Sequence, residues 1–286
     1  MKARKVGKDY IETASVDRFY SETTGVDRAA IIEDSSQALD IRMQMFEQAQ
    51  ERIVLSTFSI KTDRVSEEVF AALIAAADRG VKVQLIIDGL SGGFDMKAAP
   101  MDYVAGTHPN IEIRYYNIPN LLKPWTFNGQ LHDKYILIDD TCLLLGGRNT
   151  SNYFLGDYNP DVLSYDREIF VYNTASGTPD SPQSVISDVY AYFNTVWNDK
   201  SSVTVFDHVP FYKEKQVEEA ALHLDEVYLT MKQERPQIFL PVDYEAMTVP
   251  TNRITLITNP INPGPKEPYV LYELAMLMAH AEERVF

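Results

Sequence analysis

The sequence predicts an α/β protein with a mixed, mostly parallel β-sheet and helices on both of its faces. Residues 53–58 and 81–87 are short apolar runs, and residues 65–78 between them repeat apolar side chains at helical spacing. A strand, a helix and a second strand in this order form a parallel pair, because the helix carries the chain back to the same edge of the sheet. A chain of 286 residues, 45% of them hydrophobic, can bury such a core.

The same periodicities predict further elements on either side of this unit. A helix with one apolar face is expected before the first strand, at residues 36–52. Gly80 is expected to end the helix 65–78, because glycine adopts the left-handed conformation that closes many helices. The remaining expected elements are strands at 111–116 and 135–138, an amphipathic helix at 185–196 and a long, charged connecting helix at 213–234.

Composition and charge restrict the class of partner. The chain has 41 acidic and 26 basic residues, so its formal charge is −15. This charge repels nucleic acid at long range, and nucleic acid is therefore an unfavoured partner. The single cysteine, Cys142, lies in an apolar run and is expected to be a buried thiol. No signal peptide and no run near the roughly 18 apolar residues of a membrane span is found, which predicts a cytoplasmic or peripheral membrane protein.

One segment, residues 131–149, carries side chains suited to chemistry. His132 and Lys134 are two residues apart, so on a strand they project from the same face. Two aspartates at 139–140 stand between apolar runs and predict a hairpin with a two-residue loop. The register that this loop implies pairs Ile138 with Thr141 and His132 with Gly147.

This collection of groups suits a phosphodiester. Lys134 supplies a positive charge for phosphate oxygens, and Gly146 and Gly147 let backbone N–H groups approach without a Cβ in the way. An imidazole with an ordinary pKa of ~6.5 can be a neutral nucleophile once its other nitrogen is oriented. Asp166 and Glu168, on a strand-like segment, are the candidates for that orienting role, and Glu168 is preferred.

The spacing of this segment resembles the motif of the phospholipase D superfamily. His132-x-Lys134, four residues, Asp139, six residues and Gly-Gly-x-Asn149 match every defining position. The Tyr153-Phe154 that follows is similar to a group of bacterial cardiolipin synthases, and a weaker resemblance extends over residues 27–286. In that superfamily two such motifs, from two halves or two subunits, form one metal-independent site. One histidine attacks phosphorus to form a phosphohistidine, and the other protonates the leaving alcohol.

The resemblance implies a role for each residue of the motif. His132 becomes the nucleophile or the acid, and Lys134 and Asn149 bind phosphate. Glu168 holds the histidine, and Asp139 braces the hairpin. The sequence does not decide whether the side chain of Arg148 reaches substrate or solvent. The predicted catalytic residues are therefore His132, Lys134, Asp139 and Glu168, and the predicted substrate-binding residues are Gly146, Gly147, Arg148 and Asn149. No cofactor is expected, and no catalytic metal, because no His, Asp and Glu cluster has metal-ligand spacing.

The end of the chain repeats an earlier pattern. Residues 277–286 match 45–54 with three identical positions, and 252–259 match 27–34 more loosely. The offset of 281 − 49 = 232 predicts a second histidine motif near position ~364. We therefore expect the first half of a longer, duplicated protein. Its predicted parts are an N-terminal extension (1–26), a phospholipase D-like half (27–205), a helical connector (206–250) and the start of a second half (251–286).

These expectations favour a phosphatidyltransferase or phospholipase of the cardiolipin synthase type. Its predicted partners are a phospholipid or another phosphodiester, and a second motif from the same polypeptide or from a homodimer. The alternatives are a nuclease that uses the same site and a non-catalytic half. Asp88 is expected to cap the loop after strand 81–87, and structural roles are expected for His108, His208, His223 and His280.

Overall fold

A nine-stranded β-sheet forms the centre of the computed structural model, which describes residues 5–95, 98–159, 161, 164–261 and 266–285. The strands lie in the order β8-β4-β3-β2-β5-β6-β7-β1-β9. Their bounds are β1 Asp27–Ile32, β2 Arg52–Thr57, β3 Lys82–Asp88, β4 Ile111–Tyr116, β5 Tyr135–Ile138, β6 Cys142–Gly146, β7 Glu168–Asn173, β8 Ser202–Val205 and β9 Val249–Pro250.

The sheet is mixed, as predicted, but it is not mostly parallel. Parallel pairing joins β2 to β3 and β3 to β4, and α3 (Arg64–Asp78) provides the first crossover. Every other strand pair among the described residues is antiparallel. The loop between β5 and β6 illustrates the cause, because a connection of a few residues can join only antiparallel strands.

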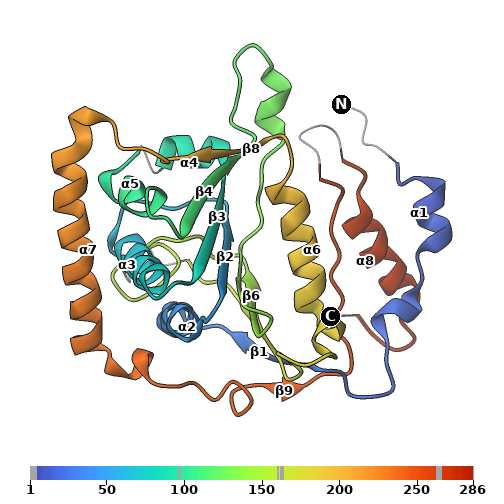
Figure 1. Cartoon of the computed structure of the whole chain (residues 1–286). Coiled ribbons are helices and arrows are strands. Elements are labelled where there is room, and N and C mark those ends of the chain that lie inside the picture. The colour runs from blue at the N-terminus through green and yellow to red at the C-terminus, as the bar shows by residue number, and fades with distance from the viewer. Residues whose placement is uncertain (1–4, 96–97, 160, 162–163, 262–265, 286) are drawn as a thin grey trace.

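Helices cover both faces of the sheet, as predicted (Figure 1). One face carries α2 (Ser35–Gln48), α3, α5 (Pro100–Gly106) and α7 (Glu214–Glu234), and the other carries α6 (Val185–Trp197). Successive side chains of a strand point to opposite faces. Leu85 of β3 therefore packs in the core with α2 and α3, whereas its neighbour Ile86 packs in the core with α6.

The predicted elements are present, with differences at their ends. The helix predicted at 36–52 ends at Gln48. Beyond that residue, the backbone N–H groups of Gln50, Glu51 and Arg52 donate to the carboxylate of Asp139 at 2.7–2.9 Å. These bonds replace the helical ones and turn the chain into β2. Cys142 is buried in β6, which confirms that prediction.

The hairpin of β5 and β6 is one residue out of the predicted register. Ile138 pairs with Cys142 rather than Thr141, so the loop contains residues 139–141 instead of two residues. Asp139 has a φ of 47°, a left-handed conformation that aspartate tolerates better than most residues. The extra residue places Gly146 opposite Lys134, whose carbonyl accepts the N–H of Gly146 at 3.1 Å.

The two ends of the described chain pack together. The rings of Tyr10, in α1 (Lys8–Thr13), and Tyr269, in α8 (Tyr269–Ala279), stack with centroids 3.7 Å apart. The buried carboxylate of Glu273 accepts the hydroxyl of Tyr10 at 2.5 Å and a guanidinium N–H of Arg18 at 3.0 Å. The division of the chain into an extension, a half, a connector and a second half stays a prediction. None of the helices within the described residues is long and apolar enough to cross a membrane.

Candidate active site

The predicted site lies at the edge of the sheet where β2 and β3 end and β5 begins. Asp88, the last residue of β3, is buried, and its carboxylate accepts the N–H groups of Leu90 and Ser91 at 3.0 Å. The same carboxylate accepts the N–H of Leu131 at 2.8 Å. Asp88 therefore caps the following loop, as predicted. It also fixes the chain directly before His132.

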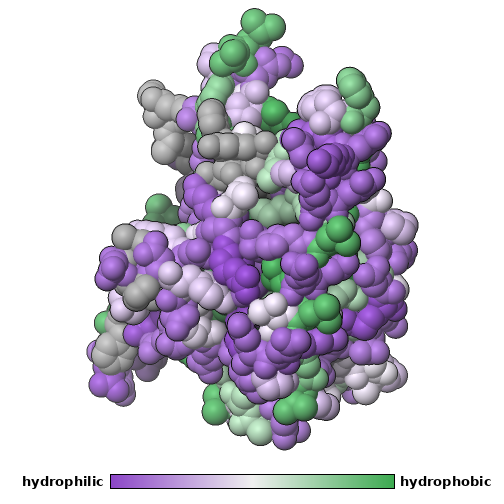
Figure 2. Space-filling view, turned by 90° about the vertical axis from the view of Figure 1, so that its left-hand side faces the viewer, coloured by the Kyte–Doolittle hydropathy of each residue, from purple (hydrophilic) through white to green (hydrophobic). Residues whose placement is uncertain are grey.

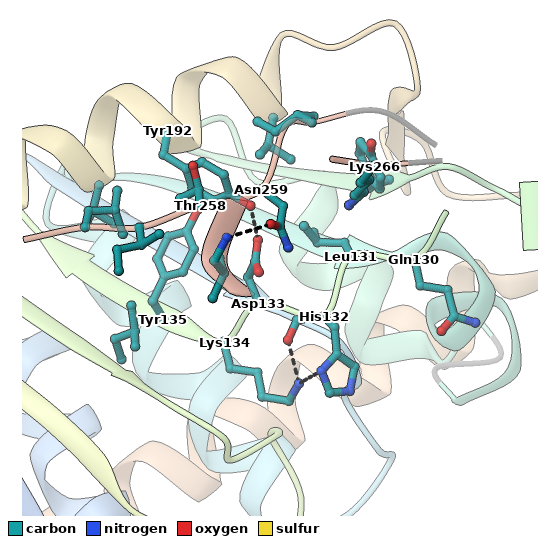
Figure 3. A pocket seen from close by; sticks show the side chains of 18 of the residues that line it. Gln130, Leu131, His132, Asp133, Lys134, Tyr135, Tyr192, Thr258, Asn259 and Lys266 are labelled. Carbon is teal, nitrogen blue, oxygen red and sulfur yellow. Dashed lines mark hydrogen bonds between the residues drawn. The ribbon is translucent and has the colours of Figure 1, made fainter. Parts of the chain in front are cut away.

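His132 and Lys134 lie side by side in front of β5 (Figure 3). Nζ of Lys134 is 3.3 Å from Nδ1 of His132 and donates to the carbonyl oxygen of His132 at 2.9 Å. The His132 ring reaches the surface, whereas Lys134 is buried. Asp133 points the other way, where its carboxylate accepts the hydroxyl of Tyr192. The alternation predicted for a strand is thus present, although residues 131–134 precede β5 and are not part of it.

An aromatic side chain that the sequence analysis did not single out completes this cluster. The ring of Phe58, directly after β2, has its centroid 4.8 Å from that of the His132 ring and 5.4 Å from Nζ of Lys134. An aromatic face attracts an ammonium group and shields it from water. The available signal was its place at the carboxyl end of a buried parallel strand, where α/β sites gather.

The surroundings favour the neutral form of the His132 ring. Desolvation lowers its pKa below the ordinary 6.5, and the positive charge of Lys134 lowers it further. Desolvation also lowers the pKa of Lys134, against the opposing charges of nearby carboxylates, of which Asp133 has the largest effect and Asp166 the next. A neutral imidazole beside a cation is therefore the expected state at neutral pH.

Asn149 is brought to the same edge of the sheet. Its Oδ1 accepts the N–H of Ser59 at 3.2 Å. The next residue continues this contact, since Thr150 donates to the carbonyl of Ser59 at 3.2 Å and accepts the N–H of Lys61 at 3.1 Å. The chain after β6 is thus tied to the chain after β2, beside Phe58.

Gly146 and Gly147 allow the chain before β7 to approach closely, whereas the prediction was a close approach of their backbone N–H groups to phosphate. A Cβ on Gly146 would overlap the side chain of Glu168, and a Cβ on Gly147 would overlap the carboxylate of Asp166. The N–H of Gly146 is used by the hairpin bond to Lys134, so it is not free for phosphate. The absence of a Cβ at both positions is what lets the chain before β7 lie against the end of β6.

Glu168 does not hold the histidine, contrary to the prediction. Its buried carboxylate pairs with the guanidinium of Arg42 at 2.5 and 2.8 Å and with that of Arg148 at 3.2 Å. Two buried cations therefore occupy the carboxylate. Arg148 is itself buried and faces neither substrate nor solvent, which corrects its predicted binding role. Its other partners are backbone carbonyls, those of Ile32, Glu33 and Asp166.

The remaining predicted acids lie in different places. Asp166, the second candidate for orienting the histidine, lies against Gly147, and its charge acts on Lys134. Asp139 lies at the opposite end of β5, where its carboxylate accepts the three N–H groups of residues 50–52. Asp139 therefore braces the hairpin, as predicted, and is too remote to touch a substrate at His132.

A cavity of about 430 Å³ opens beside this cluster (Figure 3). Residues 130–135 form one side, and Val189, Tyr192 and Val196 of α6 form another. The third side was not foreseen, because it comes from the C-terminal segment that the sequence assigns to a second half. Its lining residues are Leu256, Ile257, Thr258, Asn259, Ile261, Lys266 and Val270.

The other four histidines make contacts outside this cluster, in agreement with their predicted structural roles. His108 contacts Asp78, and His208 contacts Asp207. His223 contacts Glu67, and His280 contacts the carbonyl of Met276. Within the described part of the chain, no group of three His, Cys, Asp or Glu side chains is placed to hold a metal ion.

The mixed α/β sheet presents a histidine, a lysine and an asparagine at one edge. Residues 43–175 match the family described as "Cardiolipin synthase, PLD-like domain". This part of the chain is similar to the phospholipase D superfamily.

Similar proteins agree with this assignment. Cardiolipin synthase B of Salmonella typhi is 34% identical over 134 residues, which is 46% of this chain and 32% of the relative. An uncharacterized protein of Helicobacter pylori is 29% identical over 154 residues, 50% of this chain and 30% of the relative. The matched part of the chain therefore covers about a third of the length of these curated relatives.

A solved structure shares the fold. The crystal structure of phosphatidylserine synthase of Haemophilus influenzae superposes with a TM-score of 0.50 and 16% sequence identity. The match covers 72% of this chain and 44% of that one. At this identity the likeness supports the fold alone.

Proposed function

We propose that this chain supplies one half of the active site of a phosphatidyltransferase or phospholipase of the cardiolipin synthase type. The observation that carries the proposal is the pairing of the Lys134 ammonium with Nδ1 of His132 at 3.3 Å, beside a cavity. A cation next to a neutral imidazole can bind a phosphate oxygen while the ring reacts with phosphorus or with the leaving group.

Two chemical steps are required. In the first, a ring nitrogen attacks phosphorus, the bond from phosphorus to the leaving oxygen breaks, and an acid gives that oxygen a proton. In the second, an alcohol or water gives its proton to the group that acted as the acid, its oxygen attacks phosphorus, and the bond from phosphorus to nitrogen breaks, which restores the ring. An alcohol acceptor makes the enzyme a transferase, and water makes it a hydrolase.

The contact with Lys134 bears on which of these tasks suits His132. An ammonium group can only donate, so Nδ1 of His132 is the acceptor and the ring proton resides on Nε2. This tautomer can donate a hydrogen bond from Nε2 to the leaving oxygen, and transfer of a proton to that oxygen requires the ring to be protonated first on Nδ1. Attack on phosphorus by Nε2 requires the proton on Nδ1 instead, and therefore an acceptor for it. Because Glu168 is occupied by two arginines, Asp166 or a group from the second motif is the better candidate for that acceptor.

A single histidine cannot be nucleophile and acid in the same step. The proposal therefore includes a second motif, from a further half of the polypeptide or from a partner chain. The cardiolipin synthases matched here are about three times as long as the segment they share with this chain, which is consistent with a second half.

The competing proposal is a nuclease that uses the same site. It is the weaker one because the formal charge of −15 opposes binding of a polyanion. The test is to incubate the protein, expressed from its complete coding sequence, with phosphatidylglycerol labelled in its phosphate and with labelled single-stranded DNA. Alkaline quenching is expected to leave phosphate on the protein from the lipid and not from DNA, and the label is expected to be acid-labile. Cleavage of DNA without turnover of lipid would reject the proposal.

A further inference from the structure

A protruding apolar loop leads directly into the active-site segment. Residues 117–130 leave the sheet after β4, form a turn and a short 3-10 helix, η2 (Pro124–Asn128), and return to Leu131. They make the projection above β8 at the top of Figure 1. In Figure 2 the highest part of the molecule is hydrophobic. Leu121 and Leu122, at the tip, are 87% and 88% exposed.

Hydrogen bonds inside the loop hold these leucines outward. Asn117 has a left-handed φ of 53°, and its side-chain amide donates to the carbonyls of Thr126 and Gly129 at 2.7 and 2.8 Å. Asn120 accepts the N–H of Leu122 on its side chain at 2.9 Å and the N–H of Lys123 on its carbonyl at 2.8 Å. The exposed leucines are therefore presented by a built turn. Exposing two adjacent leucines to water is unfavourable, which indicates that another surface covers them.

The charge of this region differs from that of the rest of the chain. No acidic residue occurs between Glu112 and Asp133, in a sequence with 41 acidic residues among 286. The same stretch contains Arg114 and Lys123, and Lys123 is exposed next to the two leucines. An apolar tip with a neighbouring cation and no carboxylate is complementary to an anionic lipid surface, whereas the acidic exterior elsewhere is repelled by one.

We propose that the tip of this loop, Leu121 to Lys123, inserts into the interface of an anionic phospholipid bilayer and places His132 at the membrane surface. The inference rests on the proposed phospholipid substrate and adds the means by which the site reaches it. The N–H of Leu131 donates to the carboxylate of Asp88 at 2.8 Å, so the end of the loop is held where the catalytic segment begins. Insertion of the tip thereby sets the distance of the site from the lipid headgroups.

The test compares two double variants that change the charge equally. The loop variant is Leu121→Asp with Leu122→Asp. The control is Leu222→Asp with Leu229→Asp on α7, where both leucines are also exposed, 67% and 57%, away from the projection (Figure 1). Co-sedimentation with phosphatidylglycerol vesicles is expected to show the loop variant binding at least about tenfold more weakly than the wild type, because two buried leucine contacts are lost. The control is expected to bind like the wild type.

Other outcomes would overturn the inference. Equal binding by the loop variant, or no binding by the wild type, would do so. Equal binding of the wild type to phosphatidylcholine vesicles would remove the role of charge. A change in molar mass of the loop variant by light scattering, without a change in vesicle binding, would make the loop an interface between protein chains. Vesicle binding needs no turnover, and His132→Ala is expected to bind like the wild type. If the proposed function is wrong, the wild type will bind vesicles but will not turn over phospholipid, so this failure can be told apart from failure of the inference.

Discussion

The carboxylate of Glu168 and the guanidinium of Arg42 form a buried two-point ion pair, with nitrogen to oxygen distances of 2.5 and 2.8 Å. Arg148 approaches the same carboxylate at 3.2 Å. The three residues come from α2, from β7 and from the chain after β6. One carboxylate therefore joins three parts of the fold just behind the active-site edge.

Removing this charge is expected to destabilise the fold. Glu168→Gln keeps the size of the side chain but leaves Arg42 and Arg148 buried without a counter-ion. Breaking one side of a buried pair costs about 3–5 kcal/mol of unfolding free energy, because the remaining charge stays desolvated. The measurement is urea denaturation of the variant and the wild type.

An exposed ion pair provides the matched control. Glu33 pairs with Arg167 at 2.6 Å, and both side chains are largely in solvent. Glu33→Gln is expected to change the unfolding free energy by about 0–1 kcal/mol. If the two variants lost the same small amount, the Glu168 cluster would be no more than a surface contact.

The sequence predicted the parts of this fold that periodicity determines. The strands at 111–116 and 135–138 have the predicted bounds, and α3 begins within one residue of its predicted start. Periodicity does not count the residues of a loop, and the left-handed Asp139 therefore shifted the hairpin by one residue.

The site was predicted less completely, for a related reason. The pairing of His132 with Lys134 is local in sequence, so spacing was sufficient to predict it. The partners of Glu168 lie 126 and 20 residues away, and spacing cannot show that two arginines reach that carboxylate before the histidine does. The position of Phe58 was missed because its contacts also cross the chain.

A methyl group at Gly147 is expected to disturb the site. In Gly147→Ala the new Cβ would overlap the carboxylate of Asp166, which must shift. Because the clash is with the end of a partly exposed side chain that can rotate away, the stability cost should stay below about 1 kcal/mol, whereas turnover should fall because Asp166 lies near Lys134. Thermal unfolding and turnover are the measurements. Gly93→Ala is the control, since a Cβ there meets nothing within 4 Å, and because Gly93 lies within the helix Gly89–Asp95 the free energy of unfolding should not fall and should rise by about 0.5–1 kcal/mol.

The His132 ring is expected to titrate below the ordinary 6.5, because desolvation and the charge of Lys134 both disfavour its protonated form. The direction of the pH dependence of activity follows from this lowered pKa. A step that needs the neutral ring keeps its rate as the pH falls through 6.5 and loses it only below the lowered pKa. NMR titration of the His132 ring measures this pKa. In Lys134→Met one of the two causes is removed, so the pKa should rise, and an unchanged or lower value would show that Lys134 has no such effect.

Replacing the His132 ring is expected to remove turnover without unfolding the protein. The ring reaches the surface and packs on Phe58, so His132→Ala removes little buried contact and the melting temperature should change only slightly. Loss of the acid alone lowers a rate by about 10²- to 10⁴-fold, and loss of the nucleophile lowers it further. His223→Ala, which removes an exposed ion-pairing histidine on α7, is the control and should keep wild-type turnover. Excess chelator should leave the wild-type rate unchanged, because the proposed steps require only protein groups. A rate that fell with chelator and returned with a divalent cation would contradict this mechanism, even if His132→Ala were inactive.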